Sequence, residues 1–386
     1  MEHLSIPGRS KDLVHAVISI RTGWRHEEAN KRGISHFLEH AIFLGNKTHP
    51  LPDYETGKLG VELQGMTLPE HTLFFFTSSN KDFSGILGLF LSLIFHPGFE
   101  ESKIEKEKKE AILGAVVHQA DFTPWNLAHQ WAKNLLFNWH FALSLGTKET
   151  LKPLTRKDLE AWHAKCYHEA NSFLLIYGDI EEEKVLRIVE EAQIPSRKET
   201  PSPVEIFWKD KDIFIEREGM KNVETVYGFK VSQYDPTWEL LKILLGNHPI
   251  SKLWEEIFSK YTYTVGSSLE WVATGGGFFL YFGATSSSYV PEIERNLWEL
   301  LQNPKIDEEK VVLAKKIRSL EISKMKEGGE RGVLDFLSCN PLLEYRDFDE
   351  AIDKVNQTQK RQCLDLIERL FLEKQNTVRA TVGPRK

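Results

Sequence analysis

A proline-rich stretch divides the chain into two halves of similar length and element order. Residues 194–205 read IPSRKETPSPVE, with three prolines, two serines and several charges, which is typical of a linker. On both sides of it, β-rich patterns are followed by helical patterns in the same order. The sequence therefore predicts two related α+β domains: an N-terminal domain of residues 1–195, a linker of residues 196–207 and a C-terminal domain of residues 208–386.

Composition and charge exclude several classes of protein. The chain has 386 residues, of which 41% are hydrophobic and 27% charged, and a net charge of −7 with acids and bases interspersed. This charge gives no reason to expect nucleic acid or a membrane surface as partner. The most apolar run, residues 86–95, is too short to span a bilayer, and the N-terminus does not resemble a signal peptide. Three widely spaced cysteines without a CxxC pattern favour a reduced, cytoplasmic location.

The stretch GISHFLEHAIFLGN, residues 33–46, carries the clearest chemical pattern. On a helix, His36 and His40 lie on one face and Glu39 lies beside them. Two imidazoles in this arrangement can hold one Zn²⁺, and the glutamate can take a proton from a zinc-activated water. The spacing H-x-x-E-H thus indicates a hydrolase with His36 and His40 as metal ligands and Glu39 as general base.

The motif alone leaves a second interpretation open. The chain contains 14 histidines, so a chance match of this spacing has a probability on the order of a few per cent. The alternative is a helix that carries two histidines on its solvated edge.

Longer segments decide between the two. GWRHEEANKRGISHFLEHAIFLGNKTH resembles the entry motif of the pitrilysin, insulin-degrading enzyme and mitochondrial processing peptidase family, the inverzincin metallopeptidases. LGVELQGMTLPEHTLFF resembles the strand that follows the zinc helix in this family, and SLGTKETLKPLTRKDLEAWHAKCYHEANSFLLIYGDI is similar to its pattern throughout. The resemblance covers nearly the whole chain. It implies a half-size subunit shaped as a half-clamshell, with a mostly antiparallel sheet packed against helices in each domain.

The resemblance also implies a third zinc ligand, which this chain lacks at the expected position. In the family it is a glutamate seven residues after another acid, which Glu107 matches. Seven residues further on is Gly114, whereas an alignment that runs backwards from Asp121 gives Ala115. Glu110, one turn earlier, is the candidate third ligand, with His118 on the same helical face. The alternative for Glu110 is a solvated charge on a helix rich in Lys and Glu.

Two further positions are implied to contact substrate. The family holds its peptide as an added strand on a sheet edge, where an amide side chain corresponds to Gln64. An Arg and a Tyr complete the cleft; Phe258 stands at the Arg position and Tyr263 fits the Tyr. A surface strand residue is the alternative for Gln64, and packing in an aromatic strand is the alternative for Tyr263. Loss of the Arg is consistent with a second family subunit that supplies the pair.

We therefore expect a zinc-dependent endopeptidase subunit that cleaves extended or unfolded peptides inside a two-subunit chamber, as a homodimer or heterodimer. The alternative is a non-catalytic structural or peptide-binding subunit with a degenerate metal site. Neither nucleic acid nor a membrane is expected as partner.

Overall fold

The computed structural model describes residues 1–6, 12–113, 123–140, 144–197, 202–205, 208–258, 261–272, 275–339 and 345–384. Contacts divide the chain into two compact units, each described here by itself. Unit 1 consists of Met1–Asp121, Ala142–Glu205 and Gly329–Leu334. Unit 2 consists of Phe122–Phe141, Ile206–Gly328 and Asp335–Lys386. In the described part of the chain, no helix is long and apolar enough to cross a membrane.

Unit 1 is built on a five-stranded sheet with the order β1-β5-β2-β4-β3. Its strands are β1 (Glu2–Ile6), β2 (Leu13–Ile20), β3 (Gln64–Thr67), β4 (Thr72–Ser79) and β5 (Ser172–Tyr177). Only the β1–β5 pair is parallel; the other pairs are antiparallel. Its helices are α1 (Ile34–Ile42), α2 (Pro52–Gly57), α3 (Phe83–Phe95), α4 (Glu101–Glu107), the π-helical turn η3 (Lys108–Ile112), α7 (Lys148–Leu151), α8 (Arg156–Cys166) and α9 (Glu182–Glu191).

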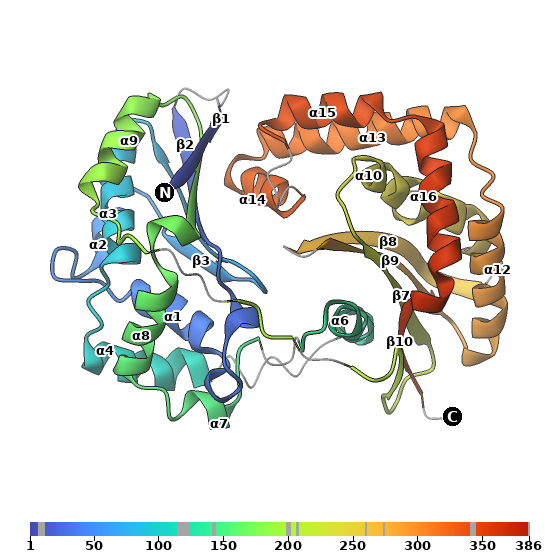
Figure 1. Ribbon diagram of the computed structural model, residues 1–386, viewed down its shortest axis with the longest axis horizontal. Helices are drawn as coiled ribbons and strands as arrows, with labels where there is room; N and C mark the ends of the chain where they lie inside the picture. The colour runs from blue at the N-terminus through green and yellow to red at the C-terminus, as the bar shows by residue number, and fades with distance from the viewer. Residues whose placement is uncertain are drawn as a thin grey trace. The chain divides into compact units, whose positions relative to one another are not determined.

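The core of unit 1 lies between one face of this sheet and its helices (Figure 1). Because side chains alternate along a strand, Ala16 and Ile18 of β2 point to the same face as Phe74 and Phe76 of the neighbouring β4. All four are fully buried, in one cluster with apolar residues of α1, α3 and α8. Each buried phenylalanine contributes about 1.5–3 kcal/mol of burial free energy. Helix α1, which carries the H-x-x-E-H motif, is thereby fixed to the sheet through its apolar side.

Unit 2 repeats the arrangement of unit 1. Its sheet has the order β6-β10-β7-β9-β8, so in both units the strands follow the order first, fifth, second, fourth, third. Its strands are β6 (Asp212–Glu216), β7 (Val223–Val231), β8 (Thr262–Val272), β9 (Gly275–Ala284) and β10 (Val378–Gly383). Again one outer pair, β6–β10, is parallel and the remaining pairs are antiparallel. The two related α+β domains with mostly antiparallel sheets are confirmed.

Helices cover both faces of the second sheet (Figure 1). Trp298 of α12 contacts Tyr227 and Phe229 on one face, whereas His129 of α6 contacts Phe279 and Tyr281 on the other. The helices of this unit are α6 (Pro124–Phe137), α10 (Thr237–Lys242), the π-helical turns η6 (Ile243–Asn247) and η7 (Trp254–Phe258), α12 (Val290–Gln302), α13 (Glu308–Glu327), α15 (Phe348–Gln357) and α16 (Lys360–Leu372). Residues of α14 (Gly329–Cys339) belong to both units.

The contact division differs from the continuous domains expected from the sequence. Helix α6 belongs to unit 2, although it lies within the range 1–195. Its buried face holds Ala128 and Ala132, and Nε2 of His129 lies 2.8 Å from Ser268 Oγ of β8. At the expected linker, the described residues 202–205 belong to unit 1, where the Val204 amide donates to the Arg25 carbonyl at 2.7 Å.

Candidate functional site

Helix α1 brings the two histidines of the motif together. The ring centroids of His36 and His40 lie 4.7 Å apart with an interplanar angle of 72°. The same helix buries Phe37 and Leu38 completely in the core, so its apolar side fixes the direction in which the imidazoles point. The geometry follows directly from the i, i+4 spacing.

His36 is a neutral imidazole, and one of its buried ring nitrogens makes no hydrogen bond to the described residues. Burial, and to a lesser degree the neighbouring His40, lowers the pKa of His36 to about 4. Its Nδ1 atom is buried, and no hydrogen-bond partner for it exists among the described residues. A neutral ring with an unused nitrogen is what a metal ion requires of a histidine ligand.

Glu107 orients the second histidine. Its Oε1 atom lies 2.8 Å from Nδ1 of His40, so Nε2 remains available for a ligand. A carboxylate on the far nitrogen of a histidine fixes the ring and raises its basicity toward a metal. Sequence comparison matched Glu107 only as the earlier acid of a pair and missed this contact. The register of α4 against α1 decides it, and no local pattern shows that register.

Glu39 lies buried against strand β3. Its carboxyl accepts a hydrogen bond from Thr67 Oγ1, and the residue is 7% exposed. Burial raises the pKa of Glu39, while Thr67 and His40 act in the opposite direction. Position 65 must be glycine for this contact, because a Cβ atom there would lie 2.8 Å from both Cγ and Oε1 of Glu39. Glu39 is thus held beside the edge strand of the sheet.

The third zinc ligand is not found where it was expected. Glu110 lies in η3, its side chain is 66% exposed, and it pairs with Lys106 at 3.8 Å. Within the described ranges, no three His, Cys, Asp or Glu side chains are grouped so that they could hold a metal. The structure therefore does not bring Glu110 to the histidine pair. Gly114, Ala115 and His118 lie outside the described residues. The two imidazoles fit zinc, but they supply only two of the three protein ligands that a catalytic site uses.

The two residues expected to contact substrate lie in different units. Gln64 begins β3, half-buried, opposite Phe75 of β4. Tyr263 lies on β8 of unit 2 and is 43% exposed; it accepts from Asn222 Nδ2 at 2.5 Å and donates to the Glu224 carboxyl. Burial raises the pKa of Glu224 to about 7. Tyr263 is therefore oriented by two polar neighbours, and its contact with substrate stays a prediction.

Comparison with known families identifies the chain. A family model described as Insulinase (Peptidase family M16) matches residues 4–129, which contain the whole histidine motif. A second, described as Peptidase M16 inactive domain, matches residues 153–318. The chain belongs to peptidase family M16. In this M16 chain, the first match ends within α6 and the second begins before α8 of unit 1, so the two matches do not coincide with the two units.

Known proteins and solved structures are similar to between 55% and 99% of the chain. An uncharacterized zinc protease of Bacillus subtilis is 22% identical over 381 residues, 92% of this chain and 89% of that protein. Protein HypA of Clostridium perfringens is 26% identical over 233 residues, 55% of this chain but only 23% of its own length. In structure, a protease from Helicobacter pylori has a TM-score of 0.83 at 18% identity and covers 99% of this chain and 97% of its own. The periplasmic protease PqqL from Escherichia coli has a TM-score of 0.76 at 17% identity, with 99% of this chain but 46% of its own covered. These two structures show a shared fold.

Proposed function

We propose that this M16 chain is the metal-bearing subunit of a zinc-dependent endopeptidase. The observation that carries the proposal is the group of Glu39, His36 and His40: a buried carboxyl of raised pKa beside two imidazoles, one of them neutral with an unused buried nitrogen. His36 and His40 would hold the ion, and Glu107 would orient His40. Zinc, when bound, supplies a Lewis acid that acidifies water and polarises a peptide carbonyl.

Glu39 is the residue that would move the proton. A general base works best when its pKa is close to the working pH, and burial shifts the pKa of Glu39 in that direction. Thr67 Oγ1 holds one carboxyl oxygen. Because Gly65 has no side chain, the other carboxyl oxygen of Glu39 can lie against strand β3.

The edge strand supports an extended peptide as substrate. Strand β3 stands at the end of the sheet order, with β4 as its neighbour, and α1 packs beside it. A peptide that adds to this edge by main-chain hydrogen bonds would pass Glu39, with Gln64 at the start of the same strand. Only an extended or unfolded segment can pair in this way, because a folded domain has already used its backbone donors.

A second family subunit is the proposed partner. The chain matches 46% of the full PqqL protease and 90% of a structure described as the first half of that protease, which supports the interpretation as half of a larger unit. The partner would supply the Arg and Tyr that complete the cleft.

Metal content and cleavage test this proposal together. Protein purified without chelator, alone and with any co-purifying chain, should contain about one zinc per His36–His40 pair. Glu39→Gln should retain zinc and lose at least about 100-fold in the rate of cleavage of an unfolded peptide. Equal rates for wild type and Glu39→Gln would exclude Glu39 as base.

A non-catalytic subunit is the second candidate. It is favoured by the lack of a third metal ligand among the described residues and by the second family model, whose description is an inactive domain. Zinc-free protein that binds unfolded peptides without cleaving them, also in the presence of its partner, would establish this alternative.

A further inference from the structure

A fully buried glutamate lies at the start of the zinc-motif helix. Glu27 is 0% exposed, its Oε2 accepts from the Gly33 amide and its Oε1 accepts from the Ser35 amide, both at 2.8 Å. Glu27 lies in the loop before α1, and the resemblance of this segment to a family motif assigned it no role. The contact joins this loop to the first turn of α1.

Helix α1 has no capping side chain of its own. Its N-cap is Gly33, at a φ of 92°, and no side chain there can accept from the first amides. Those amides lack partners inside any helix and require an acceptor. A helix of nine residues is too short to be stable alone. Glu27 therefore supplies from outside the helix what Ser, Thr or Asp at the N-cap would supply from within it.

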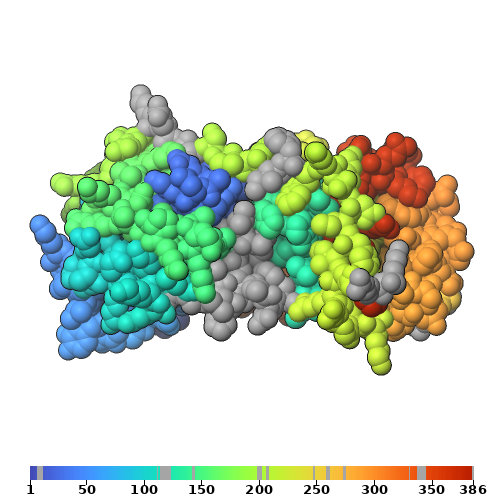
Figure 2. Space-filling view, turned by 90° about the horizontal axis from the view of Figure 1, so that it is seen from below, coloured from blue at the N-terminus to red at the C-terminus, as the bar shows by residue number. Residues whose placement is uncertain are grey.

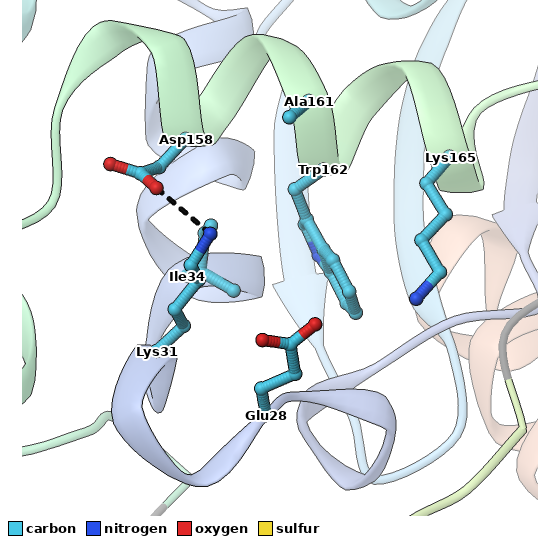
Figure 3. A pocket seen from close by; sticks show the side chains of 7 residues that line it. All are labelled: Glu28, Lys31, Ile34, Asp158, Ala161, Trp162 and Lys165. Atoms are coloured by element: carbon cyan, nitrogen blue, oxygen red, sulfur yellow. Dashed lines mark ion pairs between the residues drawn. The ribbon is translucent and has the colours of Figure 1, made fainter.

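The capped turn is the turn that carries a proposed metal ligand. His36 follows Ser35 directly, so the direction of its ring depends on how the first turn is held. The side chain of Ser35 in the same turn is also held, because Trp162 Nε1 of α8 donates to Ser35 Oγ at 3.2 Å. Outside the turn, Lys31 pairs with Asp158 of α8 at 2.9 Å (Figure 3). Figure 2 shows the segment before α1, in blue, beside the green residues of this unit, the colour of α7 and α8.

Burying Glu27 is costly. Burial raises the pKa of its carboxyl to about 8, although the amides of Gly33 and Ser35 and the charge of Arg32 act in the opposite direction. Buried ionisable groups are a weak means of stabilising a fold, because desolvation offsets much of what their contacts contribute. The buried carboxyl is therefore better explained by the geometry that it fixes than by the stability that it adds.

From these contacts we infer that Glu27 is a positioning residue of the active site, which holds the first turn of α1 so that His36 meets the ion together with His40. The inference rests on the proposed function for the role of the ion, but the ordering of the helix does not depend on it. Positioning groups behind metal ligands typically change metal affinity by 10- to 100-fold.

The test uses Glu27→Gln, with Asn171→Ala as the matched control. In Glu27→Gln an amide NH₂ would face a backbone N–H, so one hydrogen bond is lost and two donors oppose each other. Asn171→Ala also removes buried hydrogen bonds in unit 1, to Thr22 Oγ1 at 2.8 Å and the Cys166 carbonyl at 2.7 Å, but outside α1. Zinc affinity of the folded full chain, by competition with a chromophoric chelator, should fall at least about tenfold in Glu27→Gln and stay within about twofold in the control.

A metal-free measurement separates this inference from the proposed function. Amide hydrogen exchange across residues 33–42 should become faster in Glu27→Gln and remain at the wild-type level in Asn171→Ala. If wild type binds no zinc but this difference is seen, the proposed function fails and the positioning role stands. Equal exchange of α1 in both variants, or an equal loss of zinc affinity, would overturn it. Should Glu27→Gln not fold, Glu27→Asp, which retracts the carboxyl by one methylene, must give a smaller change of the same sign.

Discussion

Among the individual side chains of the site, the histidines and their supporting carboxylates differ in how far the sequence determines them. His36, Glu39 and His40 meet because four residues make about one helical turn, a rule that needs no tertiary information. The contact between Glu107 and His40 depends on where α4 packs, and Glu27 depends on a loop that returns to the helix start. Neither could be predicted from spacing.

Separate substitutions of Glu107 and Glu110 test which of these two carboxylates supports metal binding. Glu107→Gln should weaken zinc binding by about 10- to 100-fold, because it removes the carboxylate from His40 Nδ1. Glu110→Gln should leave it unchanged, since Glu110 is 66% exposed and pairs only weakly with Lys106. Isothermal titration with zinc measures both. If Glu110→Gln shows the larger loss, the third-ligand role first expected for Glu110 is restored.

The helix that carries Glu107 and Glu110 could be predicted from the sequence, but its π-helical turn could not. A helix rich in Lys and Glu was expected around Glu110, and α4 with the turn η3 occupies Glu101–Ile112. A π-helical turn holds one residue more than an α-helical turn. Positions counted along an unbroken α-helix therefore do not hold across η3. Hydrophobic periodicity does not reveal such a turn, because packing decides between the two hydrogen-bond patterns.

Strand β3 offers a test of how closely helix α1 and the sheet edge must fit. Gly65→Ala would place a methyl group 2.8 Å from the Glu39 carboxyl, and so should displace the base and reduce kcat at least about tenfold. Gly85→Ala in α3 is the control, because its Cβ meets nothing within 4 Å and alanine favours a helix by roughly 0.5–1 kcal/mol. Peptide cleavage and thermal unfolding measure both variants. A fully active Gly65→Ala enzyme would contradict the assigned fit.

In the molecule as a whole, the repeat was predictable but the assignment of one helix was not. The halves share the strand order first, fifth, second, fourth, third, which agrees with the recurring patterns on either side of the linker. Helix α6 carries a normal amphipathic pattern, with Thr123 as cap and Pro124 at its first position. That pattern predicts a buried face but not which sheet covers it. Contacts such as His129 with Ser268 assign it to the second unit.

The buried histidine of α6 makes the stability of unit 2 depend on pH. Burial, and secondarily Lys133, lowers the pKa of His129 to about 3, against about 6.5 in the unfolded chain. The unfolded state therefore binds one proton more between these values, and the contribution of His129 to stability is complete above pH 6.5 and lost as the pH falls below it. At pH 5 this loss amounts to about 2 kcal/mol, from 1.5 pH units at roughly 1.36 kcal/mol each.

His129→Gln removes this titration while keeping a side chain that can reach Ser268. Urea unfolding, followed by the fluorescence that includes Trp125 with its ring centroid 4.7 Å from that of His129, gives the unfolding free energy at each pH. Between pH 7 and pH 5 wild type should lose about 2 kcal/mol more than the variant, although the variant is the less stable protein at pH 7. Parallel curves would mean that His129 stays accessible to protons in the folded state. In that case α6 would not pack on the second sheet as closely as the contacts between His129, Phe279 and Tyr281 require.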